Sequence, residues 1–254
     1  MGTRGAANDP KRLPVRRMLL KTGAAAGNRT ARSELAAEFL GSMFLVAAAV
    51  SSMILFSAVF EAPKSVAVLA NALAVAFVLC ALIEMFGPVS GAHFNPVVTM
   101  AMALERKIGA PKAALFMLFQ FAGGVAGTVL SRLMFLGETG ALLSVSGTAR
   151  NGHAFYGEII GTFVLVLAVL VLAKAGSDKT SIVVGFLVGG QILSTSSTMF
   201  ANPQVTVARM LTDTAAGIRP ADGLAFIAMQ IAGALLASAV YRLVFAGKAK
   251  GGKA

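Results

Sequence analysis

Two short segments decide the fold of this chain: HFNPVVTMAMAL at residues 93–104 and ANPQVTVARML at residues 201–211. In each, Asn directly precedes Pro, as at the start of a helix, because Asn is a favoured N-cap and Pro suits the first helical position. Both segments are too apolar for an ordinary loop, and both are shorter than the about 20 residues that a membrane-spanning helix needs. Each is therefore predicted to be a short helix that begins at Asn-Pro and ends after about two or three turns.

Longer apolar segments surround these two. They cover residues 35–59, 65–87, 113–136, 154–173, 180–200 and 223–246. Each is long enough to cross a bilayer, and because lipid cannot satisfy backbone polar groups, each is predicted to be a helix. The expected fold is an all-α membrane protein with six transmembrane helices and two re-entrant half-helices.

Composition supports a membrane location. Only 13% of the 254 residues are charged and 57% are hydrophobic, whereas about 25% of the residues in a soluble domain are charged. The net charge of +11 does not indicate nucleic-acid binding, because the basic residues lie at the chain ends and in short connections without an aromatic-interleaved basic face. The single cysteine, Cys80, lies inside an apolar run and allows no intrachain disulfide.

The distribution of basic residues predicts the orientation. If the N-terminus is internal, 17 of the 22 Lys and Arg residues lie inside. The five that remain outside are Lys64, Arg132, Arg150, Arg209 and Arg219. This asymmetry follows the positive-inside rule, so we expect a multi-pass protein of the inner (plasma) membrane with both termini in the cytoplasm.

The segment 1–33 is basic and polar and is expected to be a disordered cytoplasmic tail. Residues 16–21 read RRMLLK, which is similar to a twin-arginine export signal. Such a signal needs an apolar stretch behind it, and here Asn28, Arg29 and Arg32 interrupt that stretch. A basic tail is the better interpretation.

The chain contains an internal repeat. The segment 38–46 (EFLGSMFLV) matches 158–166 (EIIGTFVLV), and QFAG at 120–123 matches QIAG at 230–233. Together with the two Asn-Pro segments, these matches occur in the same order, which indicates a tandem duplication. The expected halves are residues 34–136 and 153–246, joined by an extracellular loop at 137–152 and followed by a cytoplasmic tail at 247–254.

The number of spans in each half predicts a pore. An odd number, three, inverts the second half relative to the first, so the two short helices enter from opposite sides and their N-termini meet at the midplane. Irregular backbone at that depth is tolerated only where it lines a water-filled cavity or is buried in protein.

These motifs resemble those of a known family. From about residue 34 to 246 the chain is similar to the aquaporins, or major intrinsic proteins. The resemblance is carried by SGAHFNP at 90–96, by the paired boxes Asn95-Pro96-Val97 and Asn202-Pro203-Gln204, and by Glu38 and Glu158. It implies a channel in the lipid bilayer for small neutral solutes, assembled as a homotetramer with one pore in each subunit. Nothing in the sequence indicates a cofactor or a metal.

Departures from the family pattern point to a subgroup. Both boxes usually read Asn-Pro-Ala, and the family's filter arginine usually stands three residues after the second Asn, where this chain has Val205. Bacterial aquaglyceroporin-like members associated with arsenic resistance are similar in having an arginine followed by Thr-Asp-Thr, here Arg209 and 212–214.

The resemblance also implies roles for residues near the boxes. Asn95 and Asn202 are expected to aim side-chain N–H groups into the pore, and His93 to line its cytoplasmic half. Glu38 and Glu158 are expected to accept hydrogen bonds from the irregular backbone before each half-helix. The alternative for these two glutamates is a proton-coupling pair, because ionisable groups inside membranes are often functional.

The selectivity filter is predicted from an ungapped count back from each box. This count gives Val75, Gly190 and Met199, with Val205 after the second box. Such a constriction is apolar and lacks a fixed cation, which favours solutes larger than water. Arg209 lies four residues after Val205, on the same face of the half-helix. It is either a displaced filter arginine or a residue of the outer mouth, and we favour the mouth.

The sequence therefore predicts a passive channel for glycerol-like polyols, undissociated metalloid hydroxides such as arsenous acid, and water, which excludes ions and protons. The alternative is a secondary transporter on an inverted repeat, coupled to protons through Glu38 and Glu158. An enzyme is rejected because two histidines and one cysteine form no nucleophile–base pair and no cluster with metal-ligand spacing.

Overall fold

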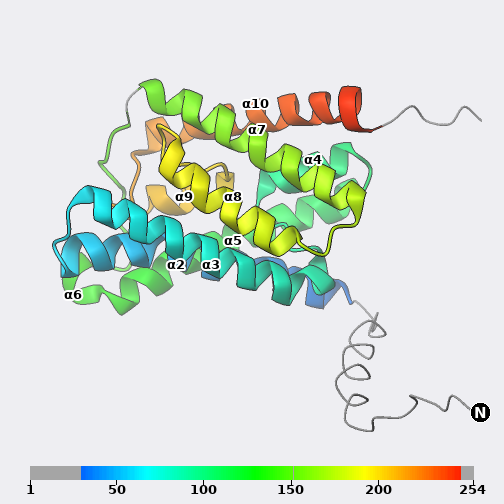
Figure 1. Cartoon of the computed structure of the whole chain (residues 1–254). Coiled ribbons are helices and arrows are strands. Elements are labelled where there is room, and N and C mark those ends of the chain that lie inside the picture. The colour runs from blue at the N-terminus through cyan, green and yellow to red at the C-terminus, as the bar shows by residue number, and fades with distance from the viewer. Residues whose placement is uncertain (1–29, 151, 247–254) are drawn as a thin grey trace, which may run out of the picture.

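The computed structural model describes residues 30–150 and 152–246, so both predicted tails lie largely outside it, including the twin-arginine-like segment at 16–21. Within the described part the chain is helical and has no strand. The α-helices are α2 (Ala31–Ile54), α3 (Lys64–Ser90), α4 (Pro96–Leu104), α5 (Ala110–Met134), α6 (Leu136–Thr139), α7 (Gly152–Ala175), α8 (Thr180–Ser194), α9 (Pro203–Met210) and α10 (Pro220–Val240) (Figure 1). Two π-helical turns, η2 (Leu55–Val59) and η3 (Tyr241–Phe245), extend α2 and α10.

The spans differ in length. Five helices, counting α2 with η2 and α10 with η3, are long and apolar enough to cross a membrane, whereas α8 has only 15 residues. The predicted helix over 180–200 therefore ends at Ser194, and the chain continues in irregular conformation. Its helical part rises about 22 Å, less than the about 30 Å hydrocarbon thickness. Irregular backbone can complete the crossing because Ser197 and residues 199–201 are buried inside the protein.

Both predicted half-helices are present and begin at the Asn-Pro pairs. Asn95 has extended backbone angles and its side chain accepts a hydrogen bond from the Val97 amide at 3.0 Å. Asn202 caps α9 in the same way, accepting from the Gln204 amide at 3.2 Å. In both helices Pro follows at the first helical position, where its missing N–H costs nothing.

The duplication is visible in the packing. The helix pairs α2–α5 and α7–α10 form equivalent contacts in the two halves. At each contact a repeated glycine allows close approach, because a Cβ on Gly123 would meet the Phe39 carbonyl oxygen and one on Gly233 would meet that of Ile159. These glycines end the two matching QFAG and QIAG segments, which explains why the repeat retains them.

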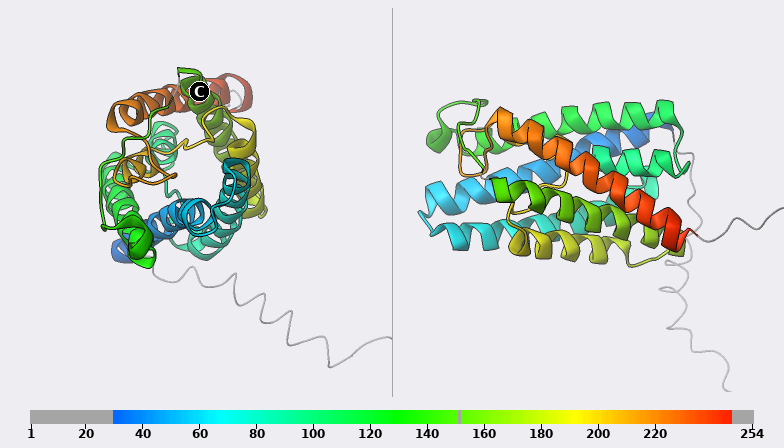
Figure 2. Two further views of the ribbon diagram at one scale, coloured as in Figure 1. Left: turned by 90° about the vertical axis from the view of Figure 1, so that its left-hand side faces the viewer. Right: turned by 90° about the horizontal axis from the view of Figure 1, so that it is seen from above.

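The bundle has two distinct ends. One, here called the tail side, carries Thr30, residues 105–109 and 176–179, and Ala246; the other, called the loop side, carries residues 60–63, 135–150 and 211–219 (Figure 1). Seen end-on, the long helices surround a central axis, and the half-helices lie inside the ring (Figure 2). The helix α9 runs from the middle toward the loop side, where Leu211 accepts a hydrogen bond from the Ser144 amide.

A further repeated pair holds the outer ends of the half-helices. Arg132 in RLMF (132–135) and Arg242 in RLVF (242–245) each follow the matched glutamine by twelve residues. On the loop side, Arg132 contacts Thr212, directly after α9, and donates to the Ala141 carbonyl at 2.6 Å. On the tail side, Arg242 donates to Glu105, directly after α4, at 2.7 Å. An arginine of the first half thus binds the end of α9, and an arginine of the second half binds the end of α4. We call these two contacts the arginine clasps.

Candidate functional site

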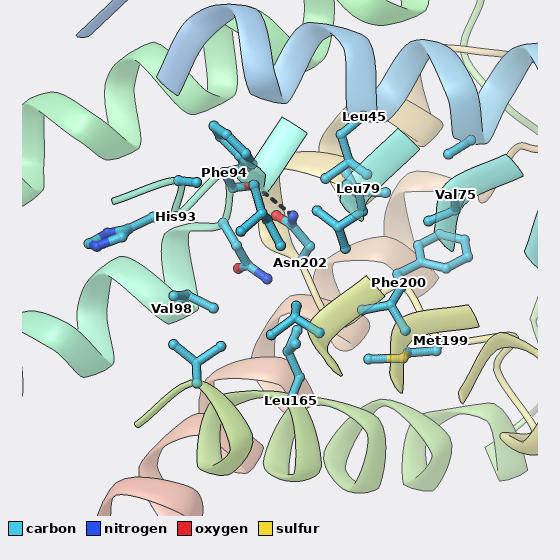
Figure 3. Close-up of a pocket in the computed structure, with 18 of the residues that line it drawn as sticks. Leu45, Val75, Leu79, His93, Phe94, Val98, Leu165, Met199, Phe200 and Asn202 are labelled. Atoms are coloured by element: carbon cyan, nitrogen blue, oxygen red, sulfur yellow. Dashed lines mark hydrogen bonds between the residues drawn. The ribbon is translucent and has the colours of Figure 1, made fainter. Parts of the chain in front are cut away.

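A cavity of about 320 Å³ runs past the N-termini of both half-helices. Most of its lining side chains are aliphatic, aromatic or Met. The polar side chains in the lining are Asn71, His93, Asn95, Thr180, Asn202 and Arg209. Figure 3 shows His93 toward one end of the cavity, Asn202 near its middle and Val75, Met199 and Phe200 toward the other end. No carboxylate belongs to the lining residues.

The two box asparagines tie the halves together at the centre. The Nδ2 of Asn95 donates to the Ala201 carbonyl at 2.8 Å, and the Nδ2 of Asn202 donates to the Phe94 carbonyl at 2.9 Å. Each amide nitrogen carries two hydrogens, so one N–H of each remains after this bond. Both residues also line the cavity, which places these remaining donors beside its centre.

Glu38 is buried behind the first box and makes four hydrogen bonds. Its carboxylate accepts from the backbone amides of His93 at 3.0 Å and Phe94 at 2.8 Å. It also accepts from the Ser90 hydroxyl at 2.6 Å and from the Gln120 side chain at 2.7 Å. The carboxylate therefore holds the irregular backbone that leads into α4.

Glu158 plays the equivalent structural part in the second half. It accepts from the backbone amides of Phe200 at 2.9 Å and Ala201 at 2.8 Å, and from the Gln230 side chain at 2.6 Å. Both glutamates have 0% exposed surface, and neither lines the cavity. Gln120 and Gln230, which the sequence showed only as repeat markers, are thus direct partners of the two glutamates.

The backbone before each box is held in an unusual conformation. Ala92 and Phe94 have positive φ, as do Met199 and Ala201 before the second box. Non-glycine residues seldom adopt this region, so the surrounding contacts must stabilise it. A Cβ on Gly41 would collide with the Phe94 ring. The Glu-x-x-Gly motif therefore combines an acceptor for the loop with the space that the loop needs.

The predicted filter residues do not all reach the cavity. Val75, Met199 and Val205 line it, but Gly190 does not and is exposed on the outside of α8. The prediction of Gly190 is wrong because its position is about 200° around the helix from Val188. The residues of α8 that line the cavity are Val184, Val188 and Ile192, which are spaced by four and share one face.

The third residues of the boxes point away from the cavity. Val97 packs in a buried cluster with Leu170 and Ala234. Gln204 donates to the Phe94 carbonyl at 3.2 Å and lies against Gly124 of α5. Pro96 and Pro203 are buried as the first residues of their helices. The departures from Asn-Pro-Ala therefore change packing behind the site rather than its lining.

His93 lines the tail-side half of the cavity. Its Nδ1 lies 3.0 Å from the Thr99 hydroxyl, and its ring meets the Phe116 ring edge-on with centroids 5.5 Å apart. These contacts fix the ring beside α4, so it can present its other nitrogen to a solute.

Arg209 lies in the cavity wall rather than only at the mouth. It is 4% exposed, and its Nε donates to the Ala216 carbonyl. Its guanidinium stacks on the Phe200 ring, 3.8 Å from the centroid. Sequence reasoning missed Phe200, which precedes the second box by two residues, and Asn71, which lies four residues before Val75. The helical spacing of Asn71 from Val75 is the signal that could have found it.

A second arginine approaches the same aromatic ring. Arg150 lies before α7, outside the spanning helices, and its guanidinium is 5.3 Å from the Phe200 centroid. Burial lowers the pKa of Arg150, while the carboxylates of Glu158 and Asp222 raise it. Among the described residues, no His, Cys, Asp and Glu side chains gather in a group that could hold a metal ion.

Comparisons with known proteins agree with this architecture. Residues 27–201 match the family model described as Major intrinsic protein. Aquaglyceroporin AqpS of Rhizobium meliloti (strain 1021) is 37% identical over 207 residues, which cover 81% of this chain and 87% of that protein. Aquaporin-4 of Mus musculus is 30% identical over 152 residues, which cover 58% of this chain and 46% of that protein. The X-ray structure of the aquaglyceroporin from Plasmodium falciparum shares the fold, with a TM-score of 0.63 at 19% identity, over 85% of this chain and 98% of that one.

Proposed function

Because this chain belongs to the major intrinsic protein family, we propose that it conducts glycerol-like polyols, undissociated metalloid hydroxides such as arsenous acid, and water. The membership makes it an integral multi-pass membrane protein and a passive channel for small solutes, not an enzyme. The choice of solutes, the exclusion of ions and protons, and the orientation are the proposal.

The lining of the cavity is the observation that carries this proposal. Its side chains are mostly apolar, and its centre presents the amides of Asn95 and Asn202. A neutral solute with hydroxyl groups loses little hydration free energy on entering. It exchanges hydrogen bonds to water for hydrogen bonds to these amide donors, and it otherwise contacts apolar walls. A cation would lose its hydration shell without any carboxylate in the lining to replace it.

The two half-helices add an electrostatic barrier against cations. Each helix N-terminus carries the equivalent of about +0.5 of an elementary charge. The hydrogen bonds between Asn95 and Ala201 and between Asn202 and Phe94 bring both N-termini to the same point. A cation or a proton at this point is therefore repelled from both sides, while an uncharged solute is not.

The size of the solute follows from Val205 and Val75. Both are apolar and line the loop-side half of the cavity, and Val205 stands where the family usually has a long cationic side chain. A valine leaves more free width than an arginine would, which favours glycerol and metalloid hydroxides over a strict water pore. One relative supports this choice, since the protein with 37% identity is described as an aquaglyceroporin.

The rival function, a proton-coupled transporter, would require the two glutamates to exchange protons with the pore. Glu38 is 0% exposed and accepts four hydrogen bonds, and Glu158 is 0% exposed and accepts three. Both oxygens of each carboxylate already accept hydrogen bonds, and neither carboxylate belongs to the cavity lining. The contacts support structural roles for both carboxylates.

We also propose that the tail side faces the cytoplasm of the cell and that four copies assemble. The positive-inside rule supports the orientation, because the described tail side carries Lys107, Lys112, Lys174 and Lys179. The resemblance to the family supports the homotetramer.

Stopped-flow light scattering of proteoliposomes tests the proposed function. Vesicles that contain the purified full chain are mixed with hyperosmotic glycerol, arsenous acid at neutral pH, or an impermeant osmolyte. We expect glycerol and arsenous acid to enter several-fold faster than in protein-free vesicles. Accelerated water flux together with solute entry at the protein-free rate would contradict the proposal.

A further inference from the structure

Arg209 lies one helical turn beyond Val205 on α9, and both line the cavity. Because α9 runs toward the loop side, the arginine lies about 6 Å farther from the boxes than the valine. The apolar layer at Val205 is therefore followed immediately by a cationic one.

The same displacement occurs across the cavity on α3. Asn71 lies one turn before Val75, and because α3 runs from the loop side to the tail side, Asn71 is the outer of the two. The Asn71 amide nitrogen donates to the Ala49 carbonyl at 2.8 Å and to the Ser52 hydroxyl at 2.9 Å. These bonds use both N–H groups, which leaves the side-chain oxygen as an acceptor beside the cavity. The side chain is 4% exposed and fixed in place.

The Arg209 guanidinium is held so that its terminal N–H groups remain for a ligand. Its Nε donates to the Ala216 carbonyl, and its Cζ lies over the Phe200 ring. In the described part of the chain, no acceptor receives a hydrogen bond from its two terminal nitrogens. Phe200 is itself fixed, because its backbone amide donates to Glu158. A buried guanidinium with four free N–H groups in a cavity wall is a preorganised donor site.

The other half of the repeat shows that the fold does not require a cation here. Counting from the two box asparagines, Arg209 corresponds to Met102, and Met102 lines the tail-side half of the same cavity. The equivalent turn of α4 is thus occupied by an uncharged side chain of similar length. The arginine is therefore a property of one half of the pore, which points to selection of the solute rather than to packing.

From these contacts we infer that Arg209 and Asn71 form the specificity-determining layer of the channel, one turn to the loop side of its apolar constriction. The layer binds small uncharged solutes that carry two or more hydroxyl oxygens. One oxygen accepts from the guanidinium, and another hydroxyl donates to the Asn71 oxygen. This inference rests on the proposed function, and it assigns the choice among neutral solutes to residues outside the filter positions predicted from the sequence.

The layer also differs in effect from an arginine at the constriction. Because the Arg209 guanidinium is held over the Phe200 ring, 3.8 Å from its centroid, its donors are fixed at the cavity wall. A solute can therefore exchange hydration water for these donors before it enters the apolar layer. Selection by hydrogen bonding and selection by width are separated along the pore.

Matched variants in proteoliposomes test this inference through the ratio of glycerol to water permeability. Arg209→Met copies the residue of the other half, and Arg209→Lys keeps the charge. The control in the opposite half is Met100→Leu, because Met100 packs on α4 outside the cavity lining. We expect Arg209→Met to lower the ratio about tenfold, the usual effect of losing a charge-assisted hydrogen bond. Asn71→Leu should lower the ratio less than Arg209→Met does, Arg209→Lys should retain part of it, and Met100→Leu should leave it unchanged.

The outcomes separate this inference from the proposed function. If the parent protein conducts no glycerol, the proposed function fails. If the parent conducts glycerol but Arg209→Met keeps or raises the ratio, or lowers glycerol and water equally, then the layer does not select solutes and the inference is overturned. Should Arg209→Met not fold, as judged by thermal unfolding in detergent, Arg209→Lys and Asn71→Leu decide by the same ratio.

Discussion

Val205 stands on α9 where the family usually places an arginine, and its side chain faces the cavity that the solute must cross. Its neighbour Gln204 faces the other way, toward α5 and the Phe94 carbonyl. Adjacent residues of one half-helix thus belong to the wall and to the packing behind it. This difference gives a matched pair of substitutions.

Replacing Val205 with Arg should reduce glycerol and arsenous acid flux about tenfold or more while water flux survives. A long cationic side chain would narrow the constriction and add donors that suit water. Gln204→Ala should cost about 1 kcal/mol of stability through one lost hydrogen bond and leave the flux ratios unchanged. Stopped-flow measurements on both variants check this. Equal losses of water and solute in folded Val205→Arg protein would indicate blockage instead.

The glutamates behind the boxes give a second prediction at this scale. Glu38→Gln replaces one acceptor oxygen by an amide donor that faces other donors, namely the amides of His93 and Phe94 or the Gln120 side chain. We expect a loss of about 2 kcal/mol or more in stability, and glycerol permeation by the protein that still folds should remain independent of pH. Thermal unfolding and flux at several pH values measure the two effects. A pH-driven uptake that the parent shows and folded Glu38→Gln protein lacks would support the transporter instead.

At the scale of elements, the half-helices were predictable and the loops before them were not. The Asn-Pro pairs locate the starts of α4 and α9 because capping chemistry is local. The end of α8 depends instead on bonds from Phe200 and Ala201 to Glu158, about 42 residues away in the chain. No periodicity reports such contacts, so the predicted span over 180–200 was too long.

The wrong filter residue on α8 also follows from the irregular loop before the second box. The count that predicts Gly190 crosses the irregular residues 195–201, where one residue does not advance the chain by a fixed angle. Once α8 has its true end, the spacing of Val184, Val188 and Ile192 defines the lining face. Asn71 shares a helix face with Val75 and is predictable from that spacing, whereas Phe200 becomes visible only when the cavity itself is known.

The repeated arginine clasps lead to a prediction about elements. Arg132 is 1% exposed and donates to the Ala141 and Thr139 carbonyls, whereas the side chain of Arg242 is 53% exposed. Arg132→Met removes the hydrogen bonds of a buried guanidinium to two carbonyls and to the buried Thr212 hydroxyl and should cost about 3 kcal/mol. Arg242→Met removes a surface pair and should cost less than about 1 kcal/mol.

Thermal unfolding of both variants in detergent compares these costs directly. The two arginines are sequence equivalents, so any difference reports their surroundings and not the substitution. Equal melting temperatures for the two variants would show that the loop-side clasp contributes no more to stability than the tail-side one.

The whole molecule is an inverted duplication whose halves have diverged where the solute passes. The two halves share the hydrogen bonds that hold the loop before each box. Glu38 accepts from Gln120 and the Phe94 amide, and Glu158 accepts from Gln230 and the Ala201 amide. The lining is shared only in part: Val98 corresponds to Val205 and Leu45 to Leu165, whereas Met102 in one half corresponds to Arg209 in the other. Such a pore has a neutral tail-side half and a cationic loop-side half around one central pair of amides.

One measurement tests the central claim, passive passage of uncharged solutes without ions or protons, most directly. Proteoliposomes that enclose a pH-sensitive dye are given a glycerol gradient and then, in the same preparation, a proton gradient with a potassium diffusion potential. The account predicts fast glycerol entry that neither gradient alters, and proton entry no faster than in protein-free vesicles. Proton flux that rises with the amount of protein, or glycerol entry driven by the proton gradient, would contradict it.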